Sequence, residues 1–283
     1  MAAVDNFSPR EIARLVETKG VAKAEAPLLA TLVLGVVAGA FIALGAVLST
    51  VVSTGSALGE GPTRLLAGLA FSLGLILVVV AGAELFTGNN LVVMSWVSGK
   101  VTLAKLLRNW GVVYVGNALG ALSVASLAYM ANWWSVAANA VGANALAIAA
   151  TKASLPFGVT FMRGILANAL VCLAVWLATA GRSLTDKVLA IVFPISAFVA
   201  AGFEHSIANM YFIPMGLLLA NQPAVVDTAA LSAERLAGLD VGGLITNISA
   251  ATLGNVVGGA GLVGLVYWFV YLRGGPSGRQ SSR

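Results

Sequence analysis

Two short polar segments interrupt a sequence that is otherwise almost entirely apolar. The first, AGAELFTGNN, begins at residue 81 and contains Glu84, and the second, AGFEHSIAN, begins at residue 201 and contains Glu204. The second segment also holds His205, which is the only histidine in the chain. Because an imidazole titrates near neutral pH, His205 is the side chain best suited to exchange a proton with the anion of a weak acid. A single histidine argues against a bis-histidine haem site and a histidine-rich zinc site, so no cofactor and no metal are expected.

The composition predicts the solvent that surrounds these polar groups. Hydrophobic residues make up 59% of the 283 residues, charged residues make up 10%, and the mean hydropathy is +0.94. A soluble domain carries roughly 25% charged residues, so the chain is predicted to be an all-α, multi-pass membrane protein and not a soluble enzyme. The net charge of +5 lies in short basic runs beside apolar segments, which is typical of topology signals and not of nucleic-acid binding. The single cysteine, Cys172, is interpreted as a small buried hydrophobe.

Six membrane crossings are predicted, because the apolar stretches are each long enough to span a bilayer. The second and fifth crossings are too long for one simple helix, and the polar segments interrupt both. An even number of crossings puts both termini on one side, together with twelve of the sixteen Lys and Arg residues. The positive-inside rule therefore predicts that both termini lie in the cytoplasm. The expected location is the cell inner (plasma) membrane. The approximate limits of the crossings are 28–54, 64–98, 103–131, 157–180, 187–219 and 242–273.

The division of the chain follows from these limits. Residues 1–26 are predicted to form a cytoplasmic interfacial helix, residues 27–273 a single transmembrane domain, and residues 274–283 a cytoplasmic tail. Phe7, Ile12, Leu15 and Val16 supply the apolar side of the interfacial helix.

The two halves of the domain, about 28–131 and 157–273, resemble each other in sequence. TxxxGxxA occurs from residues 31 and 160, GxExxxxN from 82 and 202, and NxxxxxxGNxxG from 109 and 247, always in the same order. Each half has three crossings, so the halves must insert with opposite orientations, as in many transport proteins. Irregular backbone at membrane depth is allowed only where it is buried in protein or lines a wet cavity. Two broken helices at matching places therefore indicate a pore at the interface of the halves.

The charged residues near this interface have alternative interpretations. Glu84 and Glu204 could couple proton movement, or each could accept hydrogen bonds from N–H groups freed at its helix break. The second role is favoured, because both occupy the same repeat position and only one half has a histidine. Lys152 is expected in an outer loop, where its charge could attract anions. Arg163, about two turns into the fourth crossing, could pair with a carboxylate or attract anions as well.

The sequence resembles the formate/nitrite transporter family, and within it the formate channels, over roughly residues 27–273. The resemblance rests on GRSLTDK from residue 181, GFEHSIANM from 202, IPMG from 213, GNVVGG from 254 and GAELFT from 82. It implies an aquaporin-like fold of six membrane helices, assembled as a homopentamer with one pore in each protomer. It also implies a mobile loop near Gly82–Gly88 and two apolar constrictions that flank a central chamber.

The resemblance further implies which residues line the pore. Phe71 and Phe198 correspond to the outer constriction, and Leu75, Leu85 and Phe86 to the inner one. The residues that correspond to the substrate pathway are His205, Thr87, Lys152, Asn168 and Asn255. Glu204 is added to the predicted pathway from the sequence itself. Asn117 and Asn247 are interpreted as helix-packing amides.

The expected function is a transmembrane channel or transporter for small monovalent anions of weak acids, with formate as the first choice. In this hypothesis Lys152 attracts the anion, His205 passes it a proton beside Thr87, and the neutral acid crosses the leucine constriction. Nitrite or hydrosulfide stays open as the substrate, because a pore that selects by size and protonation separates these ions poorly. A third possibility, a membrane anchor subunit of a dehydrogenase complex, would require haem or quinone ligands. The expected partners are the anion, the lipid bilayer and further copies of the chain, and no nucleic acid.

Overall fold

The computed structural model describes residues 6–274, and every secondary-structure element in this range is helical. Nearly all of the predicted tail therefore lies outside the described residues. The segment predicted to form the first helix contains α1 (Pro9–Glu25), where the Ser8 backbone N–H donates to the Glu11 carboxylate at 2.8 Å. Such a reciprocal cap satisfies donors that the first turn of a helix leaves unpaired.

The first half of the domain contains three long helical segments, and the second of them is broken. Its helices are α2 (Leu28–Ser53), α3 (Glu60–Leu77), η1 (Val78–Gly82), α4 (Phe86–Asn89), η2 (Asn90–Val92), α5 (Val93–Val97) and α6 (Leu103–Met130). The segment between η1 and α4 is extended, so the predicted interruption of the second crossing is confirmed.

The second half has the same order of long segments. After a connection with η3 (Trp133–Ser135) and α7 (Ala140–Ala153) it consists of α8 (Phe157–Ala180), α9 (Leu184–Ala200), α10 (Ser206–Leu219), α11 (Pro223–Ala229), α12 (Ala233–Leu236), α13 (Val241–Val256), η4 (Val257–Leu265) and α14 (Val266–Tyr271). The predicted fifth crossing is divided between α9 and α10. The other five crossings are helices long and apolar enough to span a membrane.

One expectation about the connections is wrong. The segment that was expected to be an outer loop around Lys152 contains the helix α7, and Lys152 lies in its last turn. α7 packs against α10 and α11, so it is part of the helical body. The sequence of α7 is rich in alanine but too short to resemble a crossing, which is why hydropathy did not separate it from a loop.

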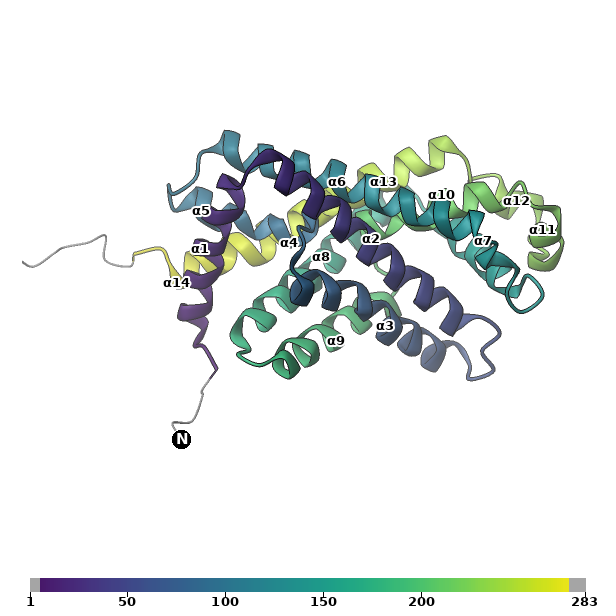
Figure 1. The fold of residues 1–283 in the computed structure, drawn as a ribbon, viewed down its shortest axis with the longest axis horizontal. Coiled ribbons are helices and arrows are strands. Elements are labelled where there is room, and N and C mark those ends of the chain that lie inside the picture. Colours follow the sequence, from purple (N-terminus) through teal and green to yellow (C-terminus); the bar gives the residue numbers. More distant parts are fainter. Residues whose placement is uncertain (1–5, 275–283) are drawn as a thin grey trace, which may run out of the picture.

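The packing of the two halves corresponds element by element. α2 packs against α3 and α6, α8 packs in the same way against α9 and α13, and α3 contacts α9 where the halves meet (Figure 1). α1 and α14 lie together at one end of the molecule, and α11 and α12 lie at the other (Figure 1). These contacts support the predicted repeat and place both helix breaks at the centre of the structure.

Glycines allow the paired helices to approach closely. A Cβ added at Gly39 in α2 would overlap the backbone of Asn117 in α6, and one added at Gly258 would overlap the carbonyl oxygen of Ile165 in α8. Small residues at helix contacts are how membrane helices bring their backbones together. The close approach also brings asparagine side chains of α6 and α13 within reach of the helix breaks.

Substitution of Gly39 by Ala is expected to destabilise the protein, because the added methyl group collides with backbone and not with a flexible side chain. Overpacking of this kind costs about 1–3 kcal/mol. Thermal unfolding of the detergent-purified protein measures the loss. Gly111→Ala is the matched control, because a Cβ at Gly111 in α6 meets nothing within 4 Å and should leave the midpoint unchanged. Equal unfolding midpoints for the two variants would contradict the proposed contact.

Candidate functional site

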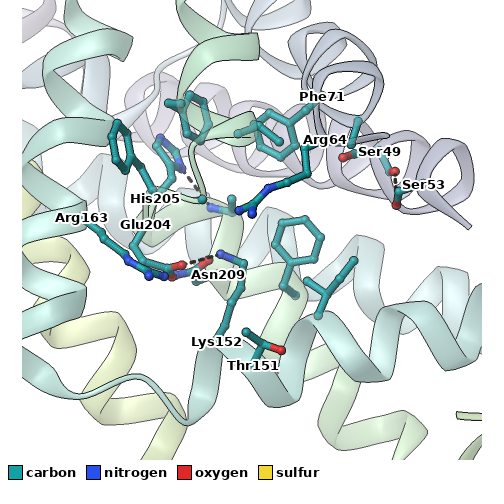
Figure 2. A pocket seen from close by; sticks show the side chains of 18 of the residues that line it. Ser49, Ser53, Arg64, Phe71, Thr151, Lys152, Arg163, Glu204, His205 and Asn209 are labelled. Atoms are coloured by element: carbon teal, nitrogen blue, oxygen red, sulfur yellow. Dashed lines mark hydrogen bonds and ion pairs between the residues drawn. The ribbon is translucent and has the colours of Figure 1, made fainter. Parts of the chain in front are cut away.

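Two cavities enter the helical body from opposite ends of α2. The first, called the Lys152 cavity, has a volume of about 420 Å³ and reaches α2 at Ser49 and Ser53 (Figure 2). The second, called the Lys23 cavity, has a volume of about 440 Å³ and reaches α2 at Leu34. The lining of each cavity includes a lysine paired with a glutamate beside a helix break; Glu204 in the first cavity is buried and Glu84 in the second is partly buried.

An asparagine from α6 bridges the first helix break. The chain turns at Gly82, where φ is +84°, a conformation that glycine adopts without steric cost. The Asn117 side chain then accepts a hydrogen bond from the N–H of Phe86 at 2.8 Å and donates to the carbonyl of Glu84 at 2.9 Å. It also donates to the carbonyl of Gly35 at 2.7 Å. One amide thus satisfies backbone groups on both sides of the break.

The second break has the same arrangement in the other half. Gly202 has a φ of +72°, and the Asn255 side chain accepts from the N–H of Ser206 at 2.9 Å. Asn255 also donates to the carbonyls of Glu204 at 3.0 Å and Gly164 at 2.8 Å. The expectation that the glutamate side chains cap the broken backbone is therefore wrong. A carboxylate only accepts hydrogen bonds, whereas an amide pairs with both N–H and C=O groups across the gap.

The Glu204 carboxylate is buried in a cluster of polar side chains. It accepts hydrogen bonds from Lys152 Nζ at 2.9 Å and from Asn209 Nδ2 at 2.6 Å, and its side chain is 3% exposed. Asn247 donates to Glu204 at 3.3 Å and to the Lys152 carbonyl at 2.9 Å, and its Oδ1 accepts from Asn209. Asn247 therefore does more than pack helices, because it ties α13 to the end of α7.

The Glu84 carboxylate is the centre of a matching cluster. Lys23 Nζ donates to it at 2.8 Å and Asn89 Nδ2 at 2.6 Å, while Asn109 donates to the Lys23 carbonyl at 3.0 Å. Lys19 lines the same cavity, and burial lowers its pKa, with the nearby charges of Lys187 and Lys23 lowering it further. Three lysines, Lys19, Lys23 and Lys187, line the Lys23 cavity together with one carboxylate, Glu84. The net positive charge of this cavity therefore favours anions.

Sequence reasoning missed Lys23, although a signal for it was present. Lys23 precedes Thr31 by the same interval as Lys152 precedes Thr160, so the repeat extends one helix further toward the N-terminus than the motifs used to define it. α1 and α7 each place a lysine at the end next to a long helix, and each lysine meets the glutamate of its own half.

His205 lies at the second break and is 2% exposed. Each of its two ring nitrogens has one hydrogen-bond partner. Its Nδ1 accepts from the N–H of Ala208 at 3.1 Å, so His205 is the N-cap of α10. A backbone N–H only donates, so in the neutral ring the proton is on Nε2. Nε2 lies 3.0 Å from the Oγ1 of Thr87, which comes from the other half of the chain.

Phe198, one of the residues predicted to form the outer constriction, stacks on His205 with ring centroids 5.9 Å apart. Phe71 and Phe198 pack edge to face with centroids 5.6 Å apart, and both line the Lys152 cavity. Leu75 and Leu85 line the Lys23 cavity. Phe71 and Leu75 are about one turn, or roughly 6 Å, apart along α3, so neighbouring turns of this helix line the two cavities. Phe86 lines neither of these cavities and packs against Trp110 and Tyr114.

Asn168 and Asn255 are completely buried and line neither cavity. Asn168 donates to the Asn255 carbonyl at 2.7 Å, to Asn90 at 2.8 Å and to the Thr87 carbonyl at 3.3 Å. These amides therefore hold the backbone that carries Thr87 and His205. Their predicted place along the substrate path stays a prediction.

Comparison with known proteins identifies the family. The model of the formate/nitrite transporter family matches residues 10–269. The chain belongs to the formate/nitrite transporter family. The formate channel FocA of Escherichia coli strain K12 is 42% identical over 95% of this chain and 96% of its own length. A probable formate transporter of Methanothermobacter thermautotrophicus is 37% identical over 94% of this chain and 97% of its own length.

Two solved structures show the same architecture. A pentameric formate channel with formate bound has a TM-score of 0.80 and 40% identity, covering 87% of this chain and 98% of its own. An ion channel of the formate/nitrite transporter family has a TM-score of 0.77 and 27% identity, covering 92% of this chain and 98% of its own. The predicted family and fold class are confirmed, and membership in a transporter family favours transport over the anchor-subunit interpretation.

In this formate/nitrite transporter, Lys152→Met is expected to destabilise the fold, because it leaves the Glu204 charge buried without its cationic partner. Breaking a buried ion pair costs about 3–5 kcal/mol. The double variant Lys152→Met with Glu204→Gln should recover most of the lost unfolding temperature in detergent, because no isolated charge remains.

Lys105→Met is the matched control for this experiment. Lys105 pairs with Glu25 at 2.8 Å, but both side chains are about half exposed, so solvent screens the pair and little change is expected. If the double variant unfolds at the same temperature as Lys152→Met, or below it, the ion pair does not have the stabilising role described.

Proposed function

We propose that this protein is a transmembrane channel or transporter for small monovalent anions of weak acids, with formate as the main substrate. The similarity to formate channels, one of them solved with formate bound, supports the substrate class. The observation that carries the proposal is the pair of cavities that approach the Thr87–His205 contact from opposite ends of α2. A path through the protein needs an entrance on each side, and these cavities provide both.

The proposal includes the assembly and its place in the cell. The protein forms a homopentamer in the inner (plasma) membrane, with both termini in the cytoplasm. A similar channel is pentameric, and many large apolar side chains of the described residues, such as Leu29, Met130 and Phe193, are exposed for contact with lipid or with further copies. The Lys23 cavity then opens to the cytoplasm, and the Lys152 cavity opens to the outside.

The apolar barrier between the cavities sets the physical problem for transport. An anion that leaves water for the space between Phe71, Leu75 and Leu85 loses its hydration, which is costly without a compensating partner. Protonation removes the charge and most of that cost. A weak acid such as formic acid therefore crosses in neutral form and releases its proton on the far side.

The proton passes through His205 in this mechanism. A proton taken up by the neutral ring adds at Nδ1, which ends the hydrogen bond from the Ala208 N–H. The imidazolium then transfers its Nε2 proton to a formate oxygen, so that formate becomes formic acid and the ring is left neutral with its proton on Nδ1. Loss of the Nδ1 proton and uptake of another at Nε2 restore the starting tautomer. Thr87 lies beside Nε2 and supplies a hydroxyl that orients the ring and the acid.

His205→Asn separates proton exchange from the structural role of the side chain. The asparagine oxygen accepts the Ala208 N–H and preserves the cap, but the amide does not titrate. Formate flux into proteoliposomes, measured at acidic and at neutral external pH, should lose its pH dependence in this variant. The wild-type protein should pass formate faster at acidic pH.

Thr87→Ser provides the control, because it keeps the hydroxyl beside Nε2 and should keep the pH dependence of wild type. A His205→Asn protein that folds and retains the full pH dependence would exclude proton exchange at this position. Absence of formate flux in the wild-type protein at every pH would exclude the proposed function itself.

A further inference from the structure

We propose that Arg163 forms an oxyanion-binding site in the Lys152 cavity, which selects planar anions with two oxygens on one central atom before they reach His205. This inference rests on the proposed function and assigns it a selectivity step. Formate and nitrite have the required shape, whereas hydrosulfide does not.

Arg163 is positioned at the second helix break by its own backbone. Its carbonyl accepts the N–H of Glu204 at 3.4 Å, which fixes this turn of α8 beside the residue that precedes His205. The side chain is partly buried and lines the Lys152 cavity together with Lys152, Glu204 and His205 (Figure 2). An anion that enters this cavity therefore meets the guanidinium near the path to the imidazole.

The other cations of the cavity are already paired. Lys152 is bound to Glu204 at 2.9 Å, and Arg64 is bound to Glu60 at 2.9 Å. Within residues 6–274 the guanidinium of Arg163 makes no ion pair within 4.0 Å and no hydrogen bond, so its donors are available. Of the cations that line this cavity, Arg163 is thus the one that can turn its whole charge and hydrogen-bonding capacity toward an anion.

Arg64 adds a second cationic wall to the site. Its Nη2 lies 2.5 Å from the point that a Cβ of Gly202 would occupy, so the missing side chain at Gly202 lets the guanidinium reach over the break. Figure 2 shows Arg64 and Arg163 approaching the cavity from different helices, α3 and α8. The local field therefore remains positive although Arg64 and Lys152 each have a carboxylate partner.

The chemistry of the guanidinium identifies the ligand class. Its planar fork presents parallel N–H groups that match the two oxygens of a carboxylate-like ion, and such bidentate pairs are stronger than single hydrogen bonds. A lysine ammonium is a point charge and has no such preference. A site based on Arg163 therefore discriminates by shape, whereas Lys152 attracts any small anion.

The experiment measures uptake into proteoliposomes as a function of concentration for formate, nitrite and hydrosulfide. Arg163→Lys should raise the half-saturating concentrations of formate and nitrite by about tenfold, because the bidentate contact is lost, and leave that of hydrosulfide unchanged. Arg163→Leu should raise all three values, and the two oxyanions most. Arg235→Gln is the control: Arg235 lies in α12 and outside the residues that line the cavity, so its loss should change none of the three values.

Two outcomes would overturn the inference. Either Arg163→Lys behaves as wild type toward both oxyanions, or it alters all three anions by the same factor. Arg163→Lys keeps the charge and decides the question even if Arg163→Leu fails to fold. If the wild-type protein passes none of the anions, the proposed function fails separately. Line broadening of ¹³C-formate by the purified protein then tests the site directly, and it must decrease in Arg163→Lys for the inference to hold.

Discussion

The structure depends on satisfying backbone groups that two broken helices leave unpaired at its centre. Unpaired N–H and C=O groups at membrane depth cost several kcal/mol each, so a broken helix persists there only if other groups replace its lost hydrogen bonds. Asn117 and Asn255 provide these bonds from α6 and α13. Their short side chains reach the breaks only because glycines let α6 approach α2 and α13 approach α8. The glycine contacts therefore set the positions of the two amides. The amides in turn hold the helix breaks, and one of these breaks positions His205.

The charged groups near the breaks also need partners that replace their contacts with water. A carboxylate that is wholly or partly buried needs a cation and further donors, and each glutamate obtains a lysine from a helix that precedes the three long segments of its half. The positive charge at each mouth is therefore anchored in the fold and is not a mobile surface group. The two halves share these ion pairs and differ in the side chains beside the breaks. Only the second break carries a histidine, and the hydroxyl beside its ring, that of Thr87, comes from the first half.

The sequence predicted the features that follow from composition and spacing. It did not predict which hydrogen-bond or ion-pair partner each buried polar side chain meets. Polar residues inside apolar stretches located both breaks, and repeated motifs paired Glu84 with Glu204 and Asn117 with Asn255. Spacing alone does not say which group a side chain meets, so Asn117 was taken for a packing residue, Asn255 for a pathway residue and the glutamates for backbone caps. α7 was missed because its alanine-rich sequence lacks the length of a crossing. Lys23 was missed because the repeat was sought only within the crossings, although the interval from Lys23 to Thr31 equals that from Lys152 to Thr160.

The two breaks differ in the space around them. A Cβ at Gly82 would meet nothing within 4 Å, and η1 before it has the wider turn of a π-helix. At the second break Arg64 covers Gly202, and His205 is held by the Ala208 N–H and by Thr87. Asn117 bonds the backbone on both sides of Leu85, as Asn255 does on both sides of His205, so the two breaks share this support and differ in the open space at Gly82. His205 and Leu85 are therefore held by different contacts, so in the proposed mechanism the proton-exchanging group and the predicted leucine constriction belong to separate parts of the fold.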